Sequence, residues 1–166
     1  LTLSNGVQVI LKPTAFRKDQ VLLGAKRFGG HTLFDEKDIP NARAASGLAA
    51  MMGLKDYAPA DLQKMRAGRD AAVTAGLGDY TDEISGHSGS GAEDLETMFQ
   101  LLWLRFDGVR RDEALYKAYM GSLNEMVRNR AAAPEQRFGE AVADTLYQRH
   151  PYELRMPKQE DVDKID

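Results

Sequence analysis

The segment AAVTAGLGDYTDEISGHSGSGAEDLETMFQLLWLRF, residues 71–106, carries the strongest indication of the fold class. Its first half is β-like and rich in turn residues, which predicts two strands joined around Gly76–Gly78. Its second half predicts a helix, in which Ser90 and Glu93 form a capping-box pattern. The apolar residues of this helix recur at three- and four-residue steps: Leu95, Met98, Phe99, Leu102 and Phe106.

Upstream, residues 1–11 predict two short strands around Asn5-Gly6, a dipeptide that accepts the positive φ angles of a tight hairpin. Residues 20–30 predict a further strand. Asn41 is the expected N-cap of a helix, and a short helix is expected from Pro59 to about Gly68. The first of these helices has an apolar stripe of Ala45, Leu48, Met51 and Met52.

Downstream, two more helices are predicted, one capped by Asp112 and one beginning at Pro134. Their apolar faces comprise Leu115, Tyr119, Ser122 and Met126 in the first helix, and Phe138, Ala141, Val142 and Thr145 in the second. The order of elements is strands, two helices, strands and three helices. This order predicts an α+β fold, a two-layer sandwich of a mostly antiparallel sheet with helices packed on one face.

Composition excludes several classes of protein. The 166 residues include 43% hydrophobic residues, which is ordinary for a globular domain, and no cysteine, which excludes disulfides and thiolate chemistry. The net charge of −3 indicates neither a nucleic-acid-binding nor a membrane-surface footprint. No apolar run approaches the ~18 residues that a membrane span requires. We expect a single α+β domain over residues 1–166. We also expect it to be a fragment of a larger protein, because the chain begins within a strand-like pattern and ends on what looks like the opening of a helix.

None of the three histidines has a second ligand at helical metal-site spacing, so His31, His87 and His150 are expected to be surface or turn residues. His150 stands before a Pro-Tyr turn, where a structural role is expected. Trp103 is expected in the core. A Ser-His-Asp triad assembled by the fold remains open, although no G-x-S-x-G motif supports one.

The segment GHSGSG, residues 86–91, lacks the Lys-Ser/Thr ending of a P-loop and is interpreted as a tight turn between strand and helix. The acid pairs Asp82-Glu83 and Glu93-Asp94 are adjacent in sequence, so their side chains point apart. They are interpreted as solvated charges and cap residues, and not as a general acid/base pair. The residues alone therefore supply no catalytic constellation.

The order of several motifs nevertheless resembles the pitrilysin/insulinase-type (inverzincin) zinc peptidases. LSNGVQVILKP, residues 3–13, is similar to their opening strand, and residues 119–165 resemble their long helix, their Pro-led helix and the H-P-Y turn that follows. This resemblance implies the fold of mitochondrial-processing-peptidase-like metallohydrolases with its C-terminal part missing. It covers nearly the whole chain.

The resemblance places the family's H-x-x-E-H motif on the helix that includes residues 41–52. The histidine positions are then Ser46 and Ala50, and the glutamate position is Ala49. Glu125 falls near the third zinc ligand and is not expected to bind metal alone, because alanine offers no ligand atom and serine is a poor one. No catalytic, cofactor-binding or metal-binding residue is therefore expected in this segment.

The resemblance implies a non-catalytic domain, the start of the C-terminal half, that forms one wall of a substrate chamber. The parent protein would hydrolyse peptides with zinc held in its other half, and that half and the peptide would be the partners. The alternative is a stand-alone, catalytically dead subunit that binds an active peptidase or another protein. The bacterial members suggest a periplasmic location, with the cytoplasm also open; substrate and oligomeric state stay undetermined.

Overall fold

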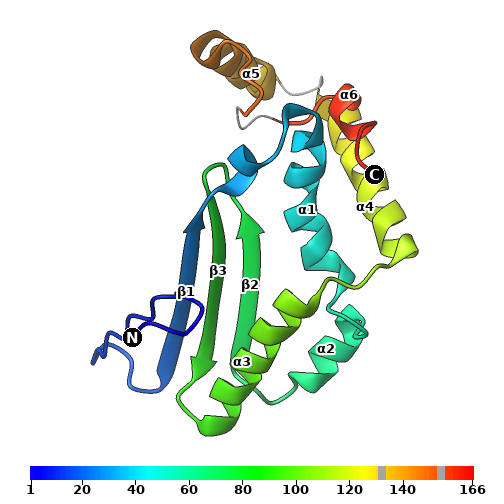
Figure 1. Ribbon diagram of the computed structural model, residues 1–166. Coiled ribbons are helices and arrows are strands. Elements are labelled where there is room, and N and C mark those ends of the chain that lie inside the picture. The colour runs from blue at the N-terminus through cyan, green and yellow to red at the C-terminus, as the bar shows by residue number, and fades with distance from the viewer. Residues whose placement is uncertain (131–133, 153–155) are drawn as a thin grey trace.

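A computed structural model describes residues 1–130, 134–152 and 156–166 of the chain (Figure 1). It is an α+β structure with a three-stranded antiparallel sheet, as the sequence predicts. The strands are β1 (Gln20–Phe28), β2 (Ala71–Leu77) and β3 (Thr81–Gly89), in the order β1-β3-β2. The predicted pair of strands in residues 71–90 is confirmed, with its turn at residues 78–80.

Six α-helices and two 3₁₀ turns are present among the described residues. The 3₁₀ turns η1 (Gly30–Leu33) and η2 (Glu36–Asp38) lead from β1 into the helices. The helices are α1 (Ile39–Met52), α2 (Pro59–Met65), α3 (Ala92–Asp107), α4 (Glu113–Asn129), α5 (Pro134–Tyr147) and α6 (Gln159–Val162). In Figure 1, α1 lies beside β2, α4 and α6 lie beyond α1, and α5 stands apart from the sheet. No described helix is both long enough and apolar enough to cross a membrane.

The core lies between one face of the sheet and α3. Met98 and Leu101 of α3 pack on Ala71 and Val73 of β2. Partly buried residues complete this cluster: Val21, Leu23, Leu62, Ile84, Leu95 and Leu102. Because side chains alternate along a strand, the residues between these point to the opposite face of the sheet. That face carries exposed Leu22 and a Lys26–Glu83 ion pair of 2.7 Å, so the described helices cover the other face of the sheet.

Three helix starts follow their local signals. Pro59 and Pro134 each occupy the first helical position, as predicted. Asp112 is the N-cap of α4, and its Oδ1 accepts hydrogen bonds from the backbone N–H groups of Ala114 and Leu115, both at 3.1 Å.

Two predicted caps are wrong. α1 begins at Ile39 with Asp38 as its N-cap, because Pro40 is compatible with the first turn; the Asn41 amide instead donates to the Asp166 carboxylate at 2.6 Å. The N-cap of α3 is Gly91, without a side-chain cap, and Glu93 forms an ion pair with Arg69.

The predicted N-terminal strands are reduced to one bridge between Thr2 and Gln8. The turn itself forms, since Gly6 has a φ of 85° and the Leu3 N–H donates to the Val7 carbonyl at 2.9 Å. The pairing stops there because Leu11 and its apolar neighbours find no covering surface among the described residues; Leu11 is 76% exposed.

The predicted helix faces are partly wrong. α1 buries Ile39, Pro40, Ala42, Ala44 and Met52, so only one member of its predicted stripe is buried. α3 buries Met98, Leu101 and Leu104, whereas Trp103 is 59% exposed and is not a core residue. Trp103 instead receives the Lys55 ammonium over its ring, 5.1 Å from the centroid. In α5 the apolar face is exposed, with Phe138 at 73%.

Candidate functional site

The middle of α1 is held against the end of β2 by Ser46. Its Oγ accepts a hydrogen bond of 2.8 Å from the backbone N–H of Leu77, the last residue of β2. Both residues are half-buried. The bond satisfies a backbone donor at the end of the strand, which would otherwise carry a desolvation cost. The hydroxyl of Ser46 is therefore used in joining helix to sheet.

The two alanines on the same part of α1 offer no ligand atom. Ala49 is half-buried and Ala50 is exposed. A zinc ion in a protein is held by three or four nitrogen, sulfur or oxygen ligands. The three positions 46, 49 and 50 together supply one side-chain oxygen, which is already bonded to Leu77.

Glu125 lies on α4 with its side chain exposed, and within the described residues it has no hydrogen bond or ion pair. Its neighbours Leu123 and Met126 line the cavity between α1 and α4, whereas Glu125 does not. Across residues 1–130, 134–152 and 156–166 no group of three or more histidine or acidic side chains is arranged to hold a metal ion. The residues at these positions do not fit a zinc ion.

α1 and α4 approach each other closely at Gly47. A Cβ atom at this position would lie 2.9 Å from the hydroxyl oxygen of Tyr119, so the absence of a side chain makes room for the tyrosine ring. Burial at this contact raises the pKa of Tyr119, because the phenolate would lose solvation. The small residues of α1 thus permit packing on two sides, against β2 and against α4.

A cavity of about 490 Å³ lies at the N-terminal end of α1, between α1, α4 and the segment around α6. Its walls are mostly apolar, and its charged side chains are of both signs: Glu36, Arg43, Asp161 and Lys164. His31 and Tyr119 also line it. The mixed charge favours no one class of ligand.

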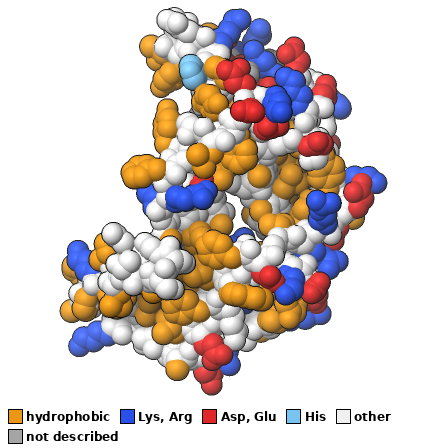
Figure 2. All heavy atoms as spheres, viewed as in Figure 1, with side chains coloured by type: hydrophobic (Ala, Val, Ile, Leu, Met, Phe, Trp, Pro, Cys, Tyr) orange, Lys and Arg blue, Asp and Glu red, His pale blue; other side chains and the backbone are white. Residues whose placement is uncertain are grey.

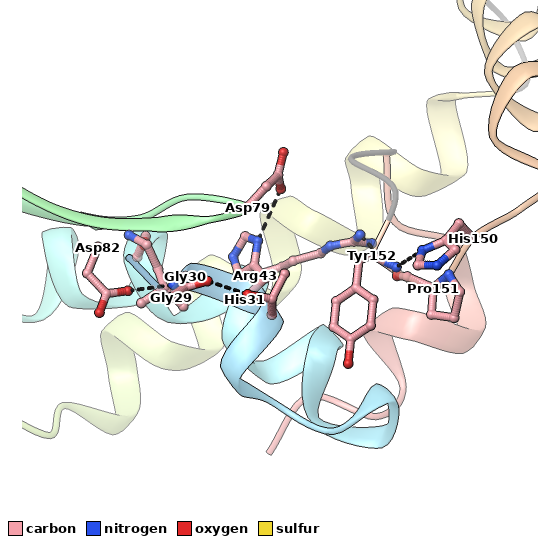
Figure 3. Close-up of polar contacts among 12 residues, drawn as sticks. Gly29, Gly30, His31, Arg43, Asp79, Asp82, His150, Pro151 and Tyr152 are labelled. Atoms are coloured by element: carbon pink, nitrogen blue, oxygen red, sulfur yellow. Dashed lines mark hydrogen bonds and ion pairs between the residues drawn. The ribbon is translucent and has the colours of Figure 1, made fainter. Parts of the chain in front are cut away.

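His31 lies in the η1 turn (Figure 3) and lines this cavity. Of the two expected settings, surface or turn, it has the turn, and its side chain is only 5% exposed. Its backbone N–H donates to the Gly78 carbonyl at 2.9 Å, and its Nδ1 lies 3.3 Å from Asp79 Oδ1. Both partners belong to the turn between β2 and β3. Sequence reasoning missed Asp79, because the contact spans 48 residues. The Gly29-Gly30 dipeptide before His31 was the available signal of a tight approach.

Asp82 secures the same turn from the other side. Its Oδ1 accepts the Gly30 N–H at 3.1 Å (Figure 3). Its Oδ2 accepts the Arg27 Nε–H at 2.7 Å. Gly30 has a φ of 61°, and a Cβ there would lie 2.3 Å from the Gly78 carbonyl oxygen, so glycine is required. Sequence reasoning also missed this role of Asp82, which is more than a solvated charge.

The other acids of the two pairs are likewise engaged. Glu83 accepts a hydrogen bond from Lys26. This hydrogen bond, together with the positive charge of Lys26, lowers the pKa of Glu83. Asp94 Oδ1 accepts the Asp70 N–H at 3.3 Å. As expected from their adjacency, the members of each pair contact different partners, and neither pair converges for acid/base chemistry.

The remaining histidines lie on separate elements. His87 is on β3, with its Nε2 3.5 Å from Asp70 Oδ1. His150 follows α5, and its Nδ1 accepts the Tyr152 N–H at 3.3 Å. This bond within the Pro-Tyr turn agrees with the structural role expected for His150. The Tyr152 hydroxyl donates to the Phe34 carbonyl at 2.9 Å, which joins this turn to the segment after η1.

Residues 86–91 form the end of β3 and the turn into α3. A Cβ on Gly89 would lie 2.3 Å from an oxygen of Asp94, so the Asp94 carboxylate packs against this turn. A phosphate-binding loop would instead need backbone N–H groups open to the ligand. The interpretation as a tight turn agrees with this geometry.

Comparisons with known proteins agree with the architecture. No family model matches the chain. A zinc protease PQQL-like protein of Arabidopsis thaliana is 30% identical over 148 residues, which cover 89% of this chain. The chain is homologous to a segment of a PqqL-like zinc protease. It spans 13% of that protein, so it corresponds to a small part of a much longer polypeptide.

Two solved structures share the fold. The periplasmic protease PqqL of Escherichia coli matches with a TM-score of 0.81 and 16% identity, over 98% of this chain and 18% of PqqL. The ferredoxin protease FusC, a mutant solved in complex with Arabidopsis ferredoxin, matches with a TM-score of 0.68 and 19% identity, over 90% of this chain and 16% of FusC. The predicted α+β fold, a mostly antiparallel sheet with helices packed on one face, is therefore confirmed and matches the fold of this segment of PqqL.

Proposed function

We propose that this chain is a non-catalytic domain of a pitrilysin-like zinc endopeptidase, positioned in the C-terminal half of the parent protein. The observation that carries the proposal is the lack of available metal ligands on α1. Ser46, Ala49 and Ala50 occupy the positions assigned to the family's H-x-x-E-H motif, and their one oxygen is bonded to Leu77.

The role of the domain is to form one wall of an enclosed chamber. The helices cover one face of the sheet and leave the other, with its Lys26–Glu83 pair, uncovered among the described residues. A wall of this kind admits flexible peptides and excludes folded proteins, and its opening and closing gate access to the zinc of the other half. The homology to a small, contiguous segment of a longer protease favours a partner half on the same polypeptide over a separate active subunit.

The proposal is tested by combining the 166-residue chain with the zinc-bearing half of its parent protein. We expect the two to associate in analytical ultracentrifugation, and cleavage of a fluorogenic peptide to exceed that of the zinc-bearing half alone. Exchange of the motif glutamate in that half for glutamine should abolish cleavage, whereas Glu125→Gln in this chain should leave the zinc content of the complex unchanged. A failure to associate would refute the proposed assembly.

Metal analysis tests the non-catalytic assignment separately. After dialysis, we expect the 166-residue chain alone to retain no stoichiometric zinc, because its α1 positions lack ligand atoms. The zinc-bearing half of the parent protein, dialysed in the same way, serves as the positive comparison. Tight zinc in the unsubstituted chain, lost in Glu125→Gln, would contradict the assignment.

A further inference from the structure

The outer edge of β2, which is the edge that does not pair with β3, is bonded by side chains from the surrounding helices. The Nε–H of Arg66, at the end of α2, donates to the Ala71 carbonyl at 3.0 Å. The Nε–H of Arg105, on α3, donates to the Val73 carbonyl at 3.0 Å. These carbonyls and the Leu77 N–H, which is bonded to α1, are two or four residues apart, so they leave the strand on the same side. At these positions the edge is therefore closed by the chain itself.

The two arginines are neighbours because their carbonyl partners are neighbours. Residues two apart in a strand are separated by about 6.6 Å, and each carbonyl binds one guanidinium group through its Nε–H. A guanidinium group has five N–H donors, so each arginine keeps four that the strand does not use. Arg66 is exposed and Arg105 is half-buried. Burial and the positive charge of Arg66 both lower the pKa of Arg105, which agrees with two adjacent cations.

No carboxylate neutralises this pair within the described residues. Arg66 and Arg105 make the two carbonyl bonds and no ion pair there. Arg69, three residues after Arg66, is in contrast paired with Glu93. Figure 2 likewise shows basic and acidic side chains intermixed over α4 and α6. Two like charges held at this separation repel each other, and an anion bound between them would remove that repulsion.

The free donors suit an oxyanion with several oxygens. Guanidinium groups bind carboxylates and phosphates through pairs of parallel N–H···O bonds. A phosphate group directs its oxygens in different directions, so it can accept from both arginines at once, whereas a carboxylate has two oxygens in one plane. A phosphate monoester carries a charge of about −1.5 to −2 near neutral pH, which matches two guanidinium groups. The arrangement therefore favours a phosphate group over a carboxylate.

We propose that Arg66 and Arg105 together bind the phosphate group of a small molecule at the outer edge of β2. The Ala71 and Val73 carbonyls hold the two side chains in place before the ligand arrives, which reduces the entropy lost on binding. This inference goes beyond the proposed function and does not depend on it. The capping of two carbonyls is a separate, structural role, which an uncharged N–H donor could also fill.

The test measures binding of methyl phosphate to the 166-residue chain by isothermal titration calorimetry at low salt. We expect Arg66→Gln and Arg105→Gln each to raise the Kd about tenfold or more, because glutamine keeps an N–H donor for the carbonyl but loses the charge-assisted bonds to the ligand. Arg111→Gln, at an exposed arginine between α3 and α4, is the matched control and should change the Kd by less than about twofold. Thermal melts by circular dichroism show whether each variant remains folded.

Arginine side-chain NMR signals supply a readout that a purely structural role would not move. On addition of methyl phosphate to the unsubstituted chain, the Nε–H signals of Arg66 and Arg105 should shift, while that of Arg111 should not. This measurement needs no substitution, so it tests the inference even if Arg105→Gln fails to fold. Unmoved Arg66 and Arg105 signals, or a Kd that Arg66→Gln leaves unchanged, would overturn the site.

Three further probes test the class of ligand and the accessibility of the pair. Acetate should bind at least about tenfold more weakly than methyl phosphate, and equal binding would contradict the preference for a phosphate group. A phosphoserine hexapeptide should bind no more than about tenfold more tightly than methyl phosphate, since a larger gain would indicate a peptide ligand. The full-length parent protein should bind methyl phosphate as the 166-residue chain does; loss of binding there would mean that another part of the protein neutralises the pair, and would refute the inference. None of these measurements uses the separated zinc-bearing half, so failure of the proposed assembly would leave them unaffected.

Discussion

Replacement of Ser46 by alanine tests whether this residue joins α1 to the sheet. The substitution removes the oxygen that accepts the Leu77 N–H at 2.8 Å and leaves that half-buried donor without its partner. An unsatisfied donor of this kind costs about 1–3 kcal/mol. Alanine is the better helix former by about 0.5 kcal/mol, which offsets part of the loss.

The net expectation is a decrease of about 0.5–2.5 kcal/mol in the free energy of unfolding. For a chain of this length, this decrease corresponds to a Tm lower by about 1–10 °C. Urea unfolding followed by circular dichroism measures the first quantity, and a thermal melt the second. Hydrogen exchange supplies a local measure, because the Leu77 amide should lose protection more than the other amides of β2.

Ala50→Ser is the matched control, since position 50 is an exposed site on the same helix and has no Leu77 to bond. It should lower stability only by the difference in helix propensity, about 0.5 kcal/mol. If Ser46→Ala were as stable as the original chain, or if the Leu77 amide kept its protection, the hydrogen bond would not hold the helix to the strand.

Three other substitutions test the core, a cap and a buried phenol. Met98→Ala, at a side chain that is 1% exposed, should reduce the free energy of unfolding by about 2–5 kcal/mol in urea titrations, with Met65→Ala at a 55% exposed site as a control that costs far less. Asp112→Ala should cost about 1 kcal/mol in the same assay, since it removes two hydrogen bonds to the first turn of α4; no change would mean that the cap is replaceable by solvent. Burial raises the pKa of Tyr119, so the unfolded chain releases this proton first and stability should fall as pH rises above about 10; Tyr119→Phe should flatten that fall in urea titrations at high pH, and an unchanged slope would contradict it.

The parts of the fold that were predicted correctly are those determined by neighbouring residues. The strands β2 and β3 are separated by a short glycine-containing turn, and the starts of α2 and α5 follow from Pro59 and Pro134. The cap by Asp112 depends on a residue and the helix turn immediately after it. Turns, helix starts and caps of this kind can be predicted from the sequence, because they depend on adjacent residues and on no distant segment.

The errors arise where a distant segment supplies the partner. Asn41 bonds to Asp166, 125 residues away, instead of capping its helix. Helical periodicity correctly indicated α3 but misplaced its buried face: residues 98, 101 and 104 are the buried ones, and Trp103 is exposed. Likewise, the burial of His31 depends on a turn that the β2–β3 pairing creates. Position along a helix can be predicted from sequence, whereas the side that is covered depends on tertiary packing.

The candidate site illustrates the same distinction and bears on the proposed role. The sequence indicates that positions 46, 49 and 50 are poor in ligand atoms, but not that Ser46 is bonded to β2 and that Gly47 admits Tyr119. The two contacts place different requirements on neighbouring positions of α1. Position 46 needs a hydroxyl to accept the N–H at the end of β2, and position 47 needs to lack a side chain so that α4 can approach. A histidine at position 46 would have to bind metal and leave the Leu77 N–H without its acceptor. Under the proposed function, return to metal binding would therefore require a new partner for the strand end as well as new ligands, which makes the packing role of α1 incompatible with a simple restoration of the motif.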